Sequence, residues 1–357
     1  MRVFAELSQV VAATIASKRQ LALARVTAES FRQHHPDIPF FTLLADEEQG
    51  CFDPAQEPYR TLKLNQLQIE EPLGFRFQYS EMELSYACTP FLIDYLIEAG
   101  YEGVVFLKQE TLVLDSLAPV FDELQRHSVL LTPHYLEPPG GASGVEWELK
   151  TLRAGVFNGG FLAFSNREES RRLLAWWKRK TRRGCFRAVD QGVHFEQRWL
   201  DFFPSFAPDA HILRDPGMNV GHWNLAERRI RVRQGRVTAG SAPCRVFRFS
   251  GYEPERPRMV TKYNPHLTVA STGEAAEVFH RYQTMLDAAG YREARQWPYA
   301  YGAYDNGVPI KERDRRIYHD LDGAAVQFGN SFTTARPGSF FRWLAAGCAR
   351  QAEAVGK

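Results

Sequence analysis

The first 46 residues alternate between short apolar runs and one amphipathic segment, and this order constrains the fold more than any other feature. The runs "VVAATIA" (10–16) and "FFTLLAD" (40–46) have the pattern of buried strands. Between them, "QLALARVTAESFRQHH" (20–35) repeats apolar residues at helical spacing, and Pro36 stops the pattern. Strand, helix and strand in this order predict a parallel sheet with helices on its faces.

The next part of the chain divides into an irregular stretch and a long helical pattern. Residues 47–78 are polar and without clear periodicity, so we expect an irregular connection. The segment "SEMELSYACTPFLIDYLIEAG" (80–100) is helical in pattern. We expect a break near Pro90, and Gly100 is placed to end the helix as a C-cap.

Further along, glycines mark two segments that could approach a ligand. "GVFNGGFLAFSN" (155–166) reads as a strand interrupted by two glycines, which often indicate close backbone approach to a bound molecule. "EPPGGASG" (137–144) predicts a flexible loop that could serve as a lid. "RRIRVRQGRVTAG" (228–240) predicts a hairpin, and a helix is expected near 274–290.

Composition bounds the class of protein. The chain has 357 residues, 44% hydrophobic and 24% charged, with a net charge of +2. This balance gives no reason to expect nucleic-acid binding. The five cysteines are scattered without a CxxC pair, which favours free thiols in a reducing compartment. The N-terminus is a poor signal peptide, and no segment approaches the roughly 20 apolar residues of a membrane helix, so we expect a cytoplasmic protein.

Several common chemistries are not indicated by the sequence. No GxGxxG follows a strand, and GxxxxGK[ST], GxSxG and HExxH are absent. The ten histidines form no set with zinc-site spacing. A dinucleotide-dependent dehydrogenase, a P-loop enzyme, a serine hydrolase and a zinc protease are therefore all disfavoured.

Six stretches, in order along nearly the whole chain, resemble bacterial glycosyltransferase family 8. They are "TIASKRQLALARVTAESFRQHHPD", "GYEGVVFLKQETLVLDSL", "FNGGFLAFSN", "FEQRWLDFFPSF", "LRDPGMNVGHWNLAERRI" and "FRFSGYEPERPRMVTKY". The resemblance implies an α/β GT-A fold, a Rossmann-like nucleotide-sugar-binding sheet with flanking helices. It would occupy residues 1–270, with a helical, aromatic-rich C-terminal extension at 271–357 packed on it.

The same resemblance implies an activity and its partners. A sugar would move, with retention at the anomeric carbon, from a nucleotide-sugar donor to a glycan, lipid-linked or small-molecule acceptor. Neither the sugar, the base nor the oligomeric state follows from the sequence, and peripheral membrane association stays open. Ligands of open α/β sheets bind at the carboxyl ends of the strands, which is where we expect the site.

The departures from the family pattern fall on its metal site. The family's Asp-x-Asp and the histidine of its "HFSG" segment surround a manganese ion, and they align with Lys108, Glu110 and Arg248. Protonated lysine and arginine have no lone pair for a cation. We therefore predict no metal cofactor, and manganese or magnesium would enter only if this alignment is wrong. Lys108 and Arg248 would replace the charge of the metal against a leaving diphosphate.

Two alternatives remain open at this point. Lys108 could pair with Glu110 in an inactive relative that serves as a sugar- or nucleotide-binding accessory protein. Alternatively, the donor could be a sugar on a nucleoside monophosphate, which needs less charge neutralisation. Convergence of Lys108 and Arg248 on one point would favour a working phosphate site.

The resemblance places three sets of residues at the site. The catalytic set is Lys108, Arg248, Glu196 and Gln197, with the carbonyl oxygen of Gln197 facing developing positive charge and Asp190-Gln191 as an alternative match. The donor-binding set is Ala13, Thr14, Ile15, Lys18, Leu107, Glu110, Asn158, Gly159, Gly160, Gly251 and Lys262. The acceptor-side set is Asn219, His222, Trp223 and Asn224, with Tyr299, Tyr301, Tyr304 and Asp305 as weaker candidates.

Overall fold

A computed structural model of the chain describes residues 9–141 and 144–355 and contains a central seven-stranded sheet. Across the sheet the strands are β10 (His211–Ile212), β6 (Val129–Pro133), β7 (Phe157–Ser165), β4 (Gly103–Leu107), β1 (Val10–Ala16), β2 (Phe40–Leu44) and β3 (Arg60–Lys63). All neighbours pair in parallel except β7, which is antiparallel to both β4 and β6. The amino end of β7 therefore meets the carboxyl ends of β1, β4 and β6 at one edge of the sheet.

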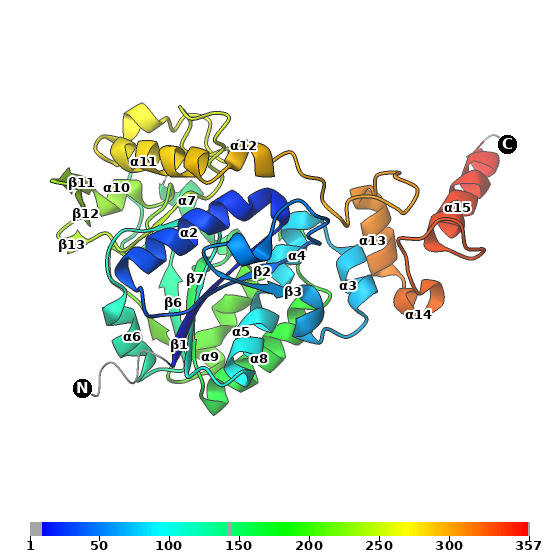
Figure 1. The fold of residues 1–357 in the computed structure, drawn as a ribbon, viewed down its shortest axis with the longest axis horizontal. Coiled ribbons are helices and arrows are strands. Elements are labelled where there is room, and N and C mark those ends of the chain that lie inside the picture. The colour runs from blue at the N-terminus through cyan, green and yellow to red at the C-terminus, as the bar shows by residue number, and fades with distance from the viewer. Residues whose placement is uncertain (1–8, 142–143, 356–357) are drawn as a thin grey trace.

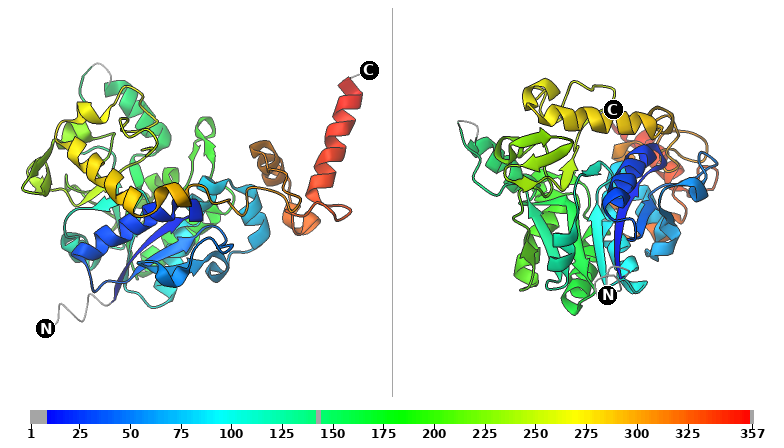
Figure 2. Two further views of the ribbon diagram at one scale, coloured as in Figure 1. Left: turned by 45° about the horizontal axis from the view of Figure 1, so that its top comes forward. Right: turned by 60° about the vertical axis from the view of Figure 1, so that its left-hand side comes forward.

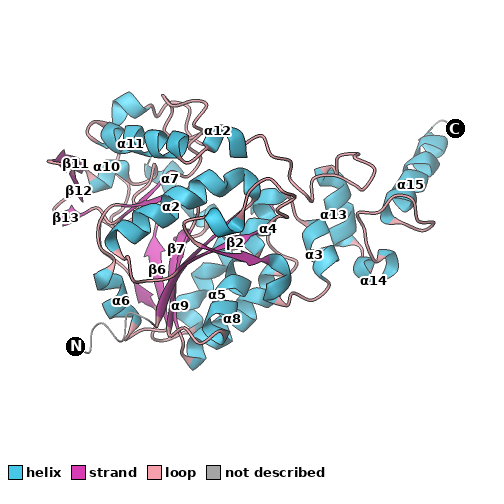
Figure 3. Cartoon of the chain, viewed as in Figure 1, coloured by secondary structure: helices cyan, strands magenta, loops and turns pink. Residues whose placement is uncertain are grey.

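Helices cover both faces of this sheet (Figure 1 and Figure 3). Along the chain they are α2 (Leu21–His34), α3 (Pro72–Gln78), α4 (Glu81–Ala87), α5 (Thr89–Glu98), α6 (Ala118–Leu124), α7 (Gly144–Ala154), α8 (Glu168–Thr181), α9 (Phe203–Phe206), α10 (Leu225–Arg228), α11 (Ala275–Ala288), α12 (Tyr291–Ala294), α13 (Glu312–Asp320), α14 (Ala324–Phe328) and α15 (Phe340–Val355). The predicted α/β class, a Rossmann-like sheet with flanking helices and a C-terminal extension, is confirmed.

The side chains of β1 alternate between two cores, as expected for a strand buried on both faces. Val11, Ala13 and Ile15 join the core under α4, α5 and α8, where Trp177 is fully buried. Ala12 and Ala16 face the second core, under α2 and α6. The first 46 residues thus form the predicted strand, helix and strand.

Three small sheets flank the main one. β5 (Thr111–Val113) pairs antiparallel with β14 (Val246–Arg248), and β11 (Ile230–Arg233) forms the predicted hairpin with β12 (Arg236–Ala239). The remaining strands are β13 (Ala242–Pro243), β8 (Arg187–Ala188) and β9 (Val193–His194). The β5–β14 pair packs with α2 and α11 in a third core, so the predicted boundary at residue 270 crosses a region packed on both sides.

The last part of the chain has its own aromatic core. Phe77 of α3 packs against Tyr318 and Phe340 of the extension. Arg315 on α13 donates hydrogen bonds to the carbonyl oxygens of Phe77 and Tyr79 at 2.6 and 2.8 Å, which joins the extension to the sheet domain. Figure 2 shows α15 projecting away from the sheet.

The sequence predictions fail mainly where pattern is weak. Residues 47–78 are not wholly irregular, because they contain β3 and α3, whose apolar residues are too few for a clear period. The break at Pro90 is confirmed, since α4 ends at Ala87 and α5 begins at Thr89. The predicted lid loop (137–144) spans Ala142 and Ser143, which lie outside the described residues, as does the start of the chain. No helix in the described part of the chain is long and apolar enough to cross a membrane.

Candidate active site

Four buried charged side chains meet at the edge of the sheet where β1, β4 and β6 end. Lys108 follows β4, and its Nζ lies 2.6 Å from Oε1 of Glu196. Arg248 ends β14, and its Nη2 donates a hydrogen bond to Oε1 of Glu110 at 2.5 Å. Their side chains are at most 15% exposed, which is unusual for ionised groups unless they are paired. The Lys108–Glu110 pair considered from the sequence does not form.

Backbone pairing brings Arg248 and Glu110 together across 138 positions of the chain. Arg248 lies opposite Thr111 in the β5–β14 register, and the amide of Phe249 donates to the carbonyl oxygen of Glu110 at 2.9 Å. Burial raises the pKa of Glu110, but the charges of Arg248 and Lys108 outweigh it and leave that pKa below its ordinary value. Glu110 is therefore an ionised partner at neutral pH.

Glu196 is held from the opposite side of the site. It is fully buried, and its carbonyl oxygen accepts a hydrogen bond from the indole of Trp177 at 3.1 Å. The preceding Phe195 has a φ of 50°, which turns the chain so that the Glu196 side chain points at Lys108. The Lys108 ammonium also lies 3.6 Å from the ring centroid of Tyr86, a cation–π contact.

The two glycines of β7 make room for these two ion pairs. A Cβ on Gly159 would lie 2.9 Å from Oε1 of Glu196. A Cβ on Gly160 would lie 1.0 Å from Nη1 of Arg248. Close approach to a bound molecule, predicted from the Gly-Gly sequence, stays a prediction, and the groups that approach these glycines in the structure are side chains of the protein itself.

Several polar atoms in the cluster have no hydrogen-bond partner among the described residues. They include Nε and Nη1 of Arg248. The Lys108–Glu196 contact is close, but its angles fall outside hydrogen-bonding geometry, so both carboxylate oxygens of Glu196 are also without a hydrogen bond. Buried polar atoms normally have a partner, and an anionic ligand would supply one to Arg248.

Asn158 and Gln197 hold the start of β7 in place. Asn158 accepts from the amide of Gly160 at 2.9 Å, and its side-chain amide lies 3.0 Å from Nε2 of His134. The side-chain oxygen of Gln197, Oε1, accepts a hydrogen bond from the amide of Gly159 at 2.9 Å. Its predicted role, to face positive charge that develops on the sugar, stays a prediction. The alternative pair, Asp190-Gln191, is exposed, whereas Glu196 and Gln197 are buried at the cluster.

His134, at the end of β6, is a buried neutral histidine. Burial lowers its pKa to about 4, and the charges of Arg248 and Lys108 act in the same direction. Its Nδ1–H donates to the carbonyl oxygen of Val156 at 3.0 Å, which leaves Nε2 to accept from Asn158. The sequence analysis did not select His134, and nothing in the sequence indicated its partners.

This histidine makes stability depend on pH. Because the pKa of His134 is about 4 when folded and about 6.5 when unfolded, its contribution is complete above pH 6.5 and is lost as the pH falls toward 4. Between pH 7.5 and 5.5 we expect a loss of about 1 kcal/mol from this residue. Urea unfolding should show His134→Gln losing less stability over that interval than the wild type. Equal losses would contradict the prediction, and exposed His280→Gln is the control.

Of the other residues predicted to bind the donor, some lie in strands near the cluster, and Lys18 makes its contacts elsewhere. Ala13, Thr14, Ile15 and Leu107 are buried strand residues of β1 and β4. Lys18 is fully buried, but its ammonium contacts Asp46, the carbonyl oxygen of Glu47 and Gln49 at 2.6–3.4 Å, so its donors are already used. Asp46 ends the second predicted strand, and the sequence reading did not select it.

Gly251 and Lys262 form part of a loop beside the cluster. Gly251 has a φ of +73° and its carbonyl oxygen accepts from the amide of Lys262 at 2.8 Å. Burial raises the pKa of Tyr263 in the same loop, and the charge of Glu110 raises it further. The Lys262 side chain is exposed at the surface.

The acceptor-side residues lie together on the segment after β10. Asn219 donates to Thr132 at 2.9 Å, and Asn224 donates to the carbonyl oxygen of His134 at 3.0 Å, so both amides shape the loop. The ring of Trp223 contacts His134 and His222 edge-on. This segment therefore adjoins the cluster through His134.

The weaker tyrosine candidates separate into two places. Tyr301 donates to Glu47 at 2.5 Å beside the Lys18–Asp46 pair, and its ring packs against Tyr299. Tyr304 belongs to the aromatic core of the extension, and Asp305 accepts hydrogen bonds from Thr334. Of these four residues, only Tyr299 and Tyr301 lie at the edge of the sheet.

Comparisons with known proteins give distant similarities. No family model matches the chain. It is 25% identical to the uncharacterised protein YfnF of Bacillus subtilis over 250 residues, 67% of this chain and 80% of YfnF. It is 21% identical to the uncharacterised YfnD of the same organism over 247 residues, 67% of this chain and 76% of YfnD.

Among solved structures, the chain is similar to the galactosyltransferase LgtC in complex with donor and acceptor sugar analogues. The TM-score is 0.46 at 17% identity, covering 78% of this chain and 95% of LgtC. It is also similar to the glycosyltransferase GlyE of Streptococcus pneumoniae TIGR4, with a TM-score of 0.45 at 12% identity, covering 82% of this chain and 67% of GlyE. These values are too low to transfer a function, which depends on the site itself.

Proposed function

We propose that this chain transfers a sugar from a nucleotide-sugar donor to an acceptor hydroxyl group, without a metal ion. The observation that carries the proposal is the buried cluster of Lys108, Glu196, Arg248 and Glu110 at the carboxyl edge of the sheet, with Nε and Nη1 of Arg248 unpartnered within the described residues. Open α/β sheets bind their ligands at this edge. Two cations placed there suit a phosphate-bearing donor.

The donor set does not fit the manganese ion that the family resemblance implies. Lys108 and Arg248 offer no lone pair, and the two carboxylates of the cluster, Glu110 and Glu196, each face one of these cations. A divalent cation would have to displace a buried, paired positive charge. We therefore assign the charge of the absent metal to the two side chains.

Arg248 divides its donors in a way that suits this role. Its Nη2 is held by Glu110, which fixes the guanidinium plane, while Nε and Nη1 remain to donate to phosphate oxygens. Lys108 adds a second positive charge beside the same two glycines of β7. Charge fixed in place before the reaction stabilises a transition state without reorganisation cost.

In the proposed step, the bond between the anomeric carbon and the diphosphate oxygen breaks, and its electron pair goes to that oxygen. The acceptor oxygen forms the new bond to the anomeric carbon, and its proton goes to the departing diphosphate. Arg248 and Lys108 stabilise the negative charge that develops there. Retention at the anomeric carbon is part of the proposal and comes from the family resemblance.

The test is donor turnover across a nucleotide-sugar panel, with products read by mass spectrometry, in EDTA and in manganese. We expect turnover to survive EDTA and to fall by about 100-fold or more in Lys108→Ala and in Arg248→Ala. Arg245→Ala is the matched control, because Arg245 precedes the same strand but pairs with Asp215 instead. The panel should include sugars on nucleoside monophosphates.

Each contrary result has a definite meaning. Turnover that requires manganese would contradict charge replacement and show that the motif is misaligned. Nucleotide binding without turnover of any donor would reject the enzyme and support a non-catalytic accessory protein. Unchanged turnover in both variants would move the site away from the cluster.

A further inference from the structure

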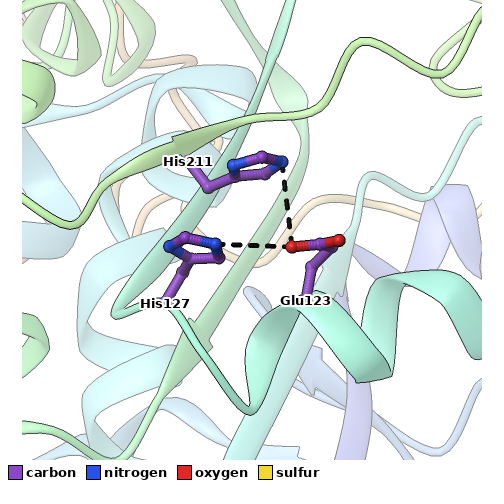
Figure 4. Close-up of side chains that lie close together, drawn as sticks. All are labelled: Glu123, His127 and His211. Carbon is purple, nitrogen blue, oxygen red and sulfur yellow. Dashed lines mark ion pairs between the residues drawn. The ribbon is translucent and has the colours of Figure 1, made fainter.

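We propose that Glu123, His127 and His211 bind one divalent transition-metal cation, with Zn²⁺ the expected ion. The Nε2 of His127 lies 3.4 Å, and the Nε2 of His211 4.0 Å, from the same Oε2 of Glu123 (Figure 4). The three ligand atoms lie within 4.8 Å of one another. Imidazole nitrogen and carboxylate oxygen are ordinary zinc ligands.

Local structure sets up this convergence. Glu123 lies in the last turn of α6, and the amide of His127, just beyond the helix, donates to the carbonyl oxygen of Glu123 at 3.1 Å, so the two side chains lie on one side of the turn that ends the helix. His211 begins β10, which pairs in parallel with β6. The two imidazole rings stack at a centroid distance of 4.5 Å, which turns both Nε2 atoms toward the carboxylate.

A hydrogen bond at the other ring nitrogen of His127 favours metal binding at its Nε2. The Nδ1 of His127 lies 3.0 Å from the carbonyl oxygen of Asp209, and donation of its N–H there leaves the Nε2 lone pair for a metal. Metal-bound histidines commonly make such a hydrogen bond with their second nitrogen.

The charged groups around the cluster are few and mostly exposed. Arg126 donates to Oε1 of Glu123 at 2.6 Å, which fixes the carboxylate and leaves Oε2 for the cation. The charge of Arg126 opposes metal binding, but this side chain is 64% exposed and therefore well screened. Arg214 is also exposed, and the Asp209 carboxylate is occupied by Ser128.

One ligand distance already suits a tetrahedral ion, and the 4.0 Å between His211 and Glu123 would close by a small side-chain movement. Zinc bonds of about 2.0–2.1 Å place neighbouring ligand atoms about 3.3 Å apart, close to the 3.4 Å observed for His127 and Glu123. The side chains are 27–35% exposed, so water can complete the shell. The cluster lies at the amino ends of β6 and β10, the edge opposite Lys108, so the ion would join edge strand β10 to α6 and take no part in catalysis.

The test uses the full chain after complete removal of any affinity tag. We expect isothermal titration with Zn²⁺ to give one equivalent per chain, and Co²⁺ to give the visible bands of a tetrahedral site. His211→Ala and Glu123→Gln should each weaken Zn²⁺ binding about 100-fold or more. Zn²⁺ should raise the Tm of the wild type by about a few degrees, because an ion that binds only the folded state stabilises it. The Tm of the two variants should not change with Zn²⁺.

His280→Ala is the matched control, because His280 is exposed on α11, away from the cluster. It should bind Zn²⁺ as the wild type does. Glu123→Gln preserves side-chain shape, so lost binding with an unchanged circular dichroism spectrum would support a metal site. Equal affinity in wild type and both variants, or no saturable binding in the wild type, would overturn the proposal.

Discussion

Replacing Glu196 with alanine should lower the free energy of unfolding by about 3–5 kcal/mol, because it leaves the Lys108 ammonium buried without a counter-charge. Both side chains are at most 8% exposed, so water cannot take the place of the carboxylate. The ring of Tyr86 would still contact Lys108, but a cation–π contact compensates only part of this loss. Urea unfolding at pH 7.5 measures the change.

Two further variants test whether the loss of stability comes from the broken ion pair or from removal of the Glu196 side chain as such. Lys108→Met combined with Glu196→Leu removes both charges, and we expect its stability to return to within about 1 kcal/mol of the wild type. Glu146→Ala breaks the exposed Glu146–Lys150 pair on α7 and should cost only about 0.3–0.5 kcal/mol. A Glu196→Ala loss as small as this control would show that Lys108 reaches water.

Gly160→Ala should reduce donor turnover about 100-fold, because the new methyl group occupies the position of the Arg248 guanidinium. Arg248 is 3% exposed and bound to Glu110, so its guanidinium can make room for the methyl group only by moving out of the site. The carbonyl oxygen of Gly160 keeps its bond to the amide of Lys108, whereas the methyl group would also lie 2.6 Å from Oδ1 of Asn158, which has to shift slightly. Turnover in EDTA and donor binding by calorimetry measure the effect.

The double variant Gly160→Ala with Arg248→Ala makes this prediction specific. With the guanidinium absent, the methyl group still lies 2.6 Å from Oδ1 of Asn158, so the double variant should be only slightly worse than Arg248→Ala alone. Gly347→Ala on α15 is the control, since a Cβ there meets nothing within 4 Å. Additive losses would indicate that Gly160 acts through Asn158 or the backbone and not through Arg248.

Features governed by local pattern could be predicted from the sequence. The alternation in the first 46 residues, the hairpin at 228–240 and the break at Pro90 depend on neighbours within a few positions. Two residues of the site, Asn158 and Gly159, could also be anticipated, because they lie in the predicted strand that two glycines interrupt. Their presence at one edge follows from the order of the sheet.

Which charge pairs with which was decided only by the tertiary structure. Antiparallel pairing of β5 with β14 sets Glu110 beside Arg248, and the turn at Phe195 sets Glu196 beside Lys108. The stacked His127 and His211 likewise meet only because β10 pairs with β6. The sequence alone determined the elements and the residue types available at their ends, since these depend on local periodicity. Long-range strand pairing selected the partners, because no local pattern records which distant strand will be adjacent.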